Sequence, residues 1–156
     1  MSLQMQGVIG EGAFSILVKA VDTYSPLEPQ KQVAIKIMNP QYNRIGVLVI
    51  FLSFLCSLVQ ESKTLRMLNG ADPEGYSHII QLLDIFHHED HFCMVEELLH
   101  STMLTAIKKL APRNMPVSEV RKIALQLITT LLFLDRHNII HAGITIEKKK
   151  TLMLKT

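Results

Sequence analysis

The chain has 156 residues, of which 48% are hydrophobic and 19% are charged, and its formal net charge is +2. This length is typical of one domain with a buried core, and a near-neutral charge spread along the chain argues against nucleic-acid binding. The two cysteines, Cys56 and Cys93, lie in apolar surroundings, which indicates buried thiols in a reducing compartment rather than a disulfide or a metal pair. The first ten residues lack the basic and apolar parts of a signal peptide. We therefore expect an intracellular protein, cytoplasmic or nuclear.

The amino-terminal third predicts three strands and two loops. Residues 6–10 and 14–21 are expected to form a hairpin around a glycine turn, and residues 32–38 a third strand. The stretch 23–31 contains two prolines and is expected to be a loop. A second polar loop is expected at residues 39–44.

An apolar run at residues 47–59, read as V-L-V-I-F-L-S-F-L-C-S-L-V, interrupts this pattern. A bilayer-spanning helix needs about 20 apolar residues, so the run is short for a membrane anchor and we do not expect membrane association. Three explanations stay open: foreign sequence from a retained intron or misjoined exons, a real insertion that extends the following helix, and a membrane hairpin. The first is our hypothesis, and it also applies to residues 143–151.

The remaining elements alternate between helices and strands. Residues 60–68 predict an amphipathic helix that ends at Asn69-Gly70. Residues 79–86 and 91–98 predict two strands joined by a polar turn. A short helix is expected at 101–110, a linker at 112–116, and the clearest helix at 118–137, with Ser118 as its cap and Asn138 at its end. The tail could contain a strand at residues 151–154.

The polar turn reads His87-His88-Glu89-Asp90-His91, which invites comparison with a zinc site. His87 and His91 would have ligand spacing only on a helix, and their flanks have the alternation of strands. We therefore expect a solvated turn and no metal site.

Two short motifs carry the strongest functional signal. Gly10 and Gly12 lie in a predicted turn, and closely spaced glycines let the backbone approach a phosphate chain without Cβ interference. The strand Val33-Ala34-Ile35-Lys36 follows, and its lysine would bring a positive charge to the same phosphates. This combination resembles the glycine-rich loop and the phosphate-binding lysine of protein kinases.

The resemblance covers nearly the whole chain, except the apolar run and the tail. It implies an α+β fold. Residues 1–99 would form a kinase-like N-lobe, a five-stranded antiparallel sheet plus one main helix, and residues 100–156 would form a truncated helical C-lobe. The phrases HFCMVEELL at 91–99 and IIHA at 139–142 are similar to the branch of dual-specificity tyrosine-regulated and homeodomain-interacting kinases.

The resemblance also implies which residues bind ATP. Lys36 would grip the α- and β-phosphates, Ile9, Leu17 and Ala34 would line the adenine slot, and Glu97 and Leu99 would offer backbone groups to the base. The full implied set is Ile9, Gly10, Glu11, Gly12, Ala13, Phe14, Ser15, Leu17, Ala34, Lys36, Glu97 and Leu99. Ser15 replaces the third glycine of the family loop.

Two further carboxylates, Glu61 and Glu96, fall near this set in the resemblance. Glu61 is the candidate for the family's ion pair with Lys36, in which a carboxylate orients the amine; the alternative is an exposed helical charge. Glu96 falls at the gatekeeper position, which is usually apolar in the family. Its carboxylate could be satisfied by Lys36, could compete for Lys36, or could indicate a shifted alignment.

The resemblance fails where the family performs catalysis. After His141-Ala142 the family has an aspartate that accepts the substrate proton and, five residues later, an asparagine that holds magnesium. This chain has Gly143 and Lys148 instead, and Glu147 is out of register. No catalytic residue and no metal ligand are therefore expected to be intact.

The parent activity implied by the family is transfer of a phosphoryl group from ATP, with Mg²⁺, to Ser, Thr or Tyr of a protein substrate. We predict that this chain alone has no significant kinase activity. Two alternatives stay open, a nucleotide-binding pseudokinase that scaffolds protein partners and a non-functional product of a mis-spliced gene. In either case part of the apolar face of 118–137 should be exposed, because the rest of a large lobe is missing.

Overall fold

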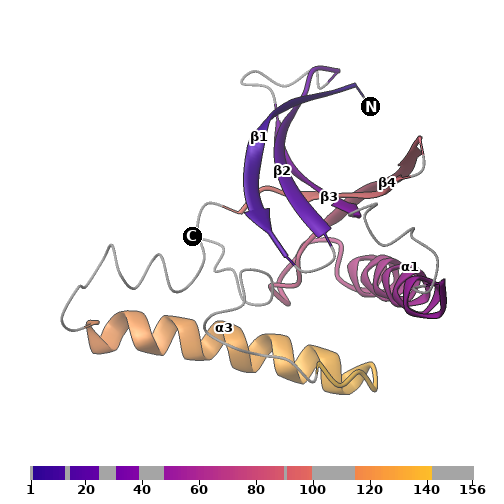
Figure 1. Ribbon diagram of the computed structural model, residues 1–156. Coiled ribbons are helices and arrows are strands. Elements are labelled where there is room, and N and C mark those ends of the chain that lie inside the picture. Colours follow the sequence, from indigo (N-terminus) through magenta and orange to yellow (C-terminus); the bar gives the residue numbers. More distant parts are fainter. Residues whose placement is uncertain are drawn as a thin grey trace. The chain divides into compact units, whose positions relative to one another are not determined.

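A computed structural model describes residues 2–12, 15–24, 31–38, 48–89, 91–99 and 115–141, with side chains in the first helix described from Val59 onward. Five strands form one sheet: β1 (Leu3–Glu11), β2 (Ser15–Asp22), β3 (Gln32–Met38), β4 (Leu82–His88) and β5 (His91–Glu97). The sheet order is β1-β2-β3-β5-β4 and all neighbouring strands are antiparallel (Figure 1). The predicted α+β fold with a five-stranded antiparallel sheet is confirmed.

Strand positions agree with the sequence pattern, whereas some strand ends differ. β1 begins three residues before the predicted start, and its pairing with β2 contains two register shifts, the second between Val8 and Gly10. β4 begins at Leu82 rather than at residue 79. β4 and β5 form the predicted hairpin, in which His88 pairs with His91 and Glu89 has a positive φ of 51°.

Alternating side chains divide the sheet into two faces, as the strand period of two requires. One face carries a core cluster from three strands, comprising Ala20, Val33, Ile35, Cys93 and Val95. The other face carries a second cluster of Phe92 and Met94, against which Leu65, Leu82 and Ile85 pack. Burial raises the pKa of the Cys93 thiol, so this free cysteine stays protonated at neutral pH. The side chain of Cys56 is outside the described residues.

Helix α1 spans Leu48–Ala71 without interruption. The sequence predicted a helix only at 60–68, ending at Asn69-Gly70, so both predicted ends were wrong. The apolar run continues directly into the amphipathic part, which supports the explanation that it extends the helix. Within the part of the chain that the structure describes, no helix is long and apolar enough to cross a membrane.

The chain divides into two compact units. The first contains residues Met1–Ala71 and Gln81–Leu98, and the second contains Asp72–Ile80 and Leu99–Thr156. The second unit includes helix α3 (Val117–Arg136), whose Thr130 hydroxyl donates a hydrogen bond to the Ser77 carbonyl at 2.8 Å. The predicted short helix at 101–110 and the predicted strand at 151–154 lie outside the described residues.

The ends of α3 agree only in part with the sequence. Pro116 rather than Ser118 occupies the N-cap, and no side chain caps the first turn. At the other end Asn138 adopts a φ of 55°, the left-handed conformation typical of the residue that follows a helix. Part of its apolar face is exposed as expected, with large apolar side chains in solvent at Val120, Ile128, Leu131 and Leu132.

Asp72 organises the turn that follows α1. Its carboxylate accepts hydrogen bonds from the backbone amides of Tyr76 at 3.0 Å and Ser77 at 2.6 Å. Burial raises the pKa of Asp72, but the hydrogen bonds from Ser77 and Tyr76 outweigh it and hold the pKa below the ordinary 3.8. The ionised form therefore stabilises the fold, and this stabilisation is present above pH 3.8 and is lost as the pH falls through the lower folded-state pKa.

We accordingly expect Asp72→Ala to lower the free energy of unfolding by about 1 kcal/mol at pH 7, because two amides lose a charged acceptor. Urea denaturation at pH 7 and at pH 3 checks this. The difference between the variant and the parent should shrink at the lower pH. A difference that stays constant between the two pH values would show that the charge of Asp72 is not what stabilises the turn.

Candidate functional site

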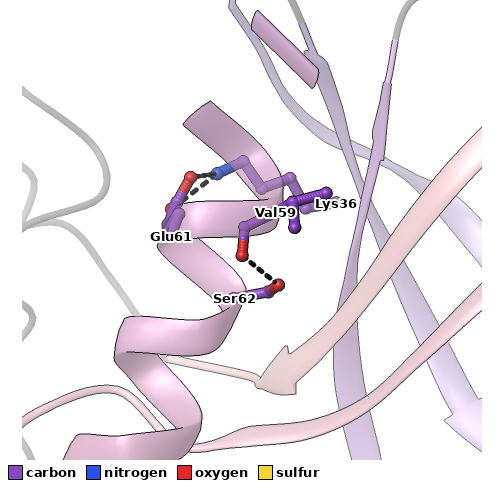
Figure 2. Close-up of polar contacts among 4 residues, drawn as sticks. All are labelled: Lys36, Val59, Glu61 and Ser62. Carbon is purple, nitrogen blue, oxygen red and sulfur yellow. Dashed lines mark hydrogen bonds and ion pairs between the residues drawn. The ribbon is translucent and has the colours of Figure 1, made fainter. Parts of the chain in front are cut away.

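Lys36 and Glu61 form the best-defined polar contact in the described part of the first unit. The Lys36 ammonium donates to both oxygens of Glu61, at 2.7 Å to Oε1 and 2.6 Å to Oε2 (Figure 2). The Lys36 side chain is 7% exposed and that of Glu61 is 43% exposed. Burying an ammonium group is costly unless a partner neutralises it, so Glu61 is what allows Lys36 to lie inside the protein.

The alternation of β3 explains why Lys36 meets a helix. Val33 and Ile35 enter the first core cluster, so Ala34 and Lys36 lie on the opposite face of the strand. That opposite face also carries the cluster against which Leu65 of α1 packs. Lys36 therefore leaves the sheet on the side where α1 supplies a carboxylate.

Three residues at helical spacing hold α1 in this position. Glu61 binds Lys36, Leu65 packs on the sheet, and the side-chain oxygen of Asn69 accepts a hydrogen bond from the Leu82 amide at 2.8 Å. Positions i, i+4 and i+8 lie on one side of a helix, so these contacts act together. Neither Leu65 nor Asn69 was predicted to hold α1 on the sheet, although their spacing from Glu61 is visible in the sequence.

Ser62 strengthens the turn around Glu61. Its hydroxyl donates to the Val59 carbonyl at 2.9 Å, and the residue is buried (Figure 2). The bond keeps the polar group of Ser62 satisfied within α1.

The glycine turn joins β1 to β2, and β2 pairs with β3, the strand that carries Lys36. The Gly12 amide donates to the Ser15 carbonyl at 2.8 Å, Glu11 and Gly12 are exposed, and Ser15 is buried. Gly10 pairs with Leu17, and Leu17 in turn pairs with Lys36 across β2 and β3. Ile9 is 42% exposed, and Ala13 and Phe14 lie outside the described residues.

The residues expected to contact the adenine base follow β3 and β5. Ala34 and Glu96 are buried and pair directly with each other across these strands. Glu97 uses its side chain locally, because its Oε1 accepts from the Gln81 amide at 2.9 Å and its own amide donates to the Gln81 carbonyl at 3.0 Å. Leu99 is half-buried and belongs to the second unit.

The geometry can hold a phosphate-bearing ligand better than a metal ion. Lys36 has three N–H donors, two of which point at Glu61, so one remains for a phosphate oxygen. Among the described residues, no group of three or more His, Cys, Asp or Glu side chains could hold a metal ion. Gly143, Glu147 and Lys148 lie outside these residues, so the expected loss of the catalytic base and magnesium ligands rests on the sequence alone.

Comparisons with known proteins point in one direction. A model of the family described as "Protein kinase domain" matches residues 3–154. The chain is 32% identical over 140 residues to serine/threonine-protein kinase ppk15 of Schizosaccharomyces pombe, which covers 89% of this chain and 24% of the relative. It is 33% identical over 142 residues to the probable serine/threonine-protein kinase yakA of Dictyostelium discoideum, covering 89% of this chain and 9% of the relative.

The name of a third relative places that relative in the DYRK family of kinases. The DYRK-family kinase pom1 of Schizosaccharomyces pombe is 27% identical over 139 residues, which cover 89% of this chain and 12% of pom1. The chain thus spans a quarter or less of the length of these three relatives.

Proposed function

Because this chain belongs to the protein kinase domain family, on its DYRK-like branch, we propose that it binds ATP at the site built around Lys36. The observation that carries the proposal is the ion pair between the buried Lys36 ammonium and the Glu61 carboxylate. A lysine held by a carboxylate has its ammonium oriented before the ligand arrives, so less freedom is lost on binding.

In this proposal the sheet contacts the purine and the glycine turn contacts the phosphates. Leu17 and Ala34 would face the purine, because both lie on the face of the sheet that carries Lys36. The backbone of Gly10 and Gly12 would approach the phosphates, with Ser15 in place of a third glycine. The backbone carbonyl of Glu97, whose amide already donates to Gln81, would bind the edge of the base.

We further propose that the parent activity is transfer of a phosphoryl group from ATP, assisted by Mg²⁺, to Ser or Thr, or to Tyr, of intracellular proteins. The relatives are named serine/threonine-protein kinases, which supports Ser and Thr as acceptors. When bound, Mg²⁺ neutralises phosphate charge in this reaction. Without an aspartate and asparagine after Ala142, this chain would bind the nucleotide and transfer nothing.

Thermal unfolding with increasing Mg-ATP tests the binding proposal. We expect a saturable rise in Tm, because a ligand that binds only the folded state stabilises it by mass action. Lys36→Ala should abolish the rise, whereas Lys122→Ala, which removes an exposed lysine of α3, should retain it. A folded sample with no shift at millimolar Mg-ATP would contradict the proposal and favour a non-functional gene product.

The absence of catalysis is tested separately. Purified chain incubated with Mg-ATP labelled on the γ-phosphate and a general protein substrate should show no more transfer than the Lys36→Ala variant. Transfer that Lys36→Ala removes would overturn the prediction of inactivity while leaving ATP binding intact.

A further inference from the structure

Glu96 lies on the face of the sheet that carries Lys36. Along β5, Cys93 and Val95 belong to the first core cluster, whereas Phe92 and Met94 belong to the second. Glu96 continues the alternation of Phe92 and Met94, and no register shift interrupts the pairing of β3 with β5. The residue is only 7% exposed, so a carboxylate is buried on the same side as the ammonium of Lys36.

The strand register places these two side chains diagonally. Glu96 pairs with Ala34, and Lys36, two residues further along β3, pairs with Met94. Diagonal neighbours on adjacent antiparallel strands are about 7–8 Å apart, a span that long side chains can bridge. Ala34 has only a methyl group, so the position opposite Glu96 on β3 carries no bulky side chain.

The charges around Glu96 come from three elements. Lys36 lies on β3, Glu61 lies on α1 and is bound to Lys36, and Lys19 pairs with Ala34 from β2 on the same face. Glu96 is thus a second carboxylate beside a lysine that already has one carboxylate partner. A nucleotide that enters here adds further negative charge to the same lysines.

We infer that Glu96 sets the nucleotide affinity of this site by competing with the phosphates for the Lys36 ammonium, an inference that rests on the proposed ATP binding. Lys36 has one donor beyond the two that bind Glu61. A phosphate oxygen and the Glu96 carboxylate both attract that donor, and at this depth their mutual repulsion is weakly screened. ATP therefore binds more weakly than the Lys36–Glu61 pair alone would allow.

The test measures Kd by isothermal titration for adenosine, AMP, ADP and ATP with the whole chain and with Glu96→Gln, which removes the charge and keeps the shape. The substitution should tighten binding more as the number of phosphates rises. We expect the Kd of adenosine to stay about the same and the Kd of ATP to fall about tenfold. Glu89→Gln removes one charge from the exposed turn of the same hairpin and should leave all four values unchanged. Glu96→Leu provides a second neutral variant if the amide variant does not fold.

The pattern of results separates the possible failures. A gain of equal size for adenosine and ATP would mean that Glu96 acts through packing, and this would overturn the inference, as would an unchanged or weaker ATP affinity in both neutral variants. If no variant binds adenosine or ATP, the proposed function fails and the inference fails with it.

Discussion

Replacing Met94 by alanine should lower the free energy of unfolding by about 2–5 kcal/mol, the range for removing a fully buried side chain of this size. Met94 has no exposed surface and lies at the centre of β5, where Phe92, Leu65 and Ile85 share its cluster. The loss would combine reduced burial with an unfilled cavity between the sheet and α1. Denaturation by urea, followed by circular dichroism, gives the value.

Met5→Ala is the matched control for this substitution. Met5 lies on β1 and is 64% exposed, so its truncation should change the free energy of unfolding by no more than about 0.5 kcal/mol. Equal losses at Met5 and Met94 would contradict the assignment of the second cluster as a core that holds α1 on the sheet.

A double-mutant cycle on Lys36 and Glu61 should give a coupling free energy of about 1–2 kcal/mol in stability. Fully buried pairs cost about 3–5 kcal/mol when one partner is removed, and exposed pairs contribute about 1 kcal/mol or less. This pair falls between the two because Lys36 is buried while the Glu61 side chain is 43% exposed. The cycle uses Lys36→Met, Glu61→Gln and the double variant, each measured by urea denaturation.

The chain contains its own reference for an exposed pair. Lys122 and Glu119 on α3 are 2.8 Å apart, with side chains that are 68% and 39% exposed. A cycle on this i,i+3 pair should yield only about 0.2–0.5 kcal/mol. If the Lys36–Glu61 coupling did not exceed that of Lys122–Glu119, burial would not strengthen the contact and Lys36 would not need Glu61.

Much of the fold was predictable because short-range patterns determine it. Strict alternation identified β3, and the polar turn between two alternating stretches identified the β4–β5 hairpin. Periodicity did not predict that β5 lies between β3 and β4. Sequence alternation carries no information about which strands are neighbours, so this order is known only from the structure.

Helix α1 was the largest error, and its cause is physical. The run 47–59 has no charged residue and only two serines, so it lacks a clear polar face and its helical period cannot be recognised from hydrophobicity. The Asn69-Gly70 stop signal also did not end the helix where expected. Asn69 is used for a hydrogen bond to β4 instead, a contact between segments that no local rule includes.

The contact between Lys36 and Glu61 was predictable because it involves only two residues, each found in a recognisable motif. Lys36 and Glu61 were chosen as a pair, and the structure places them in contact. The contributions of Leu65 and Asn69 depend on how α1 meets the sheet, and the buried position of Glu96 beside Lys36 depends on strand register. Such long-range relations exist only in the folded chain.

Because α1 is unbroken, the Lys36–Glu61 ion pair is connected through one helix to residues far from the site. Glu61 follows Leu48 by more than three helical turns, about 20 Å at 1.5 Å per residue. A helix is stiff over that length, so its two ends move together. Leu65, which packs on the sheet, is the point at which α1 is held. We expect a molecule bound at the first turn of α1 to shift Glu61 relative to Lys36, because the helix connects the two without a break.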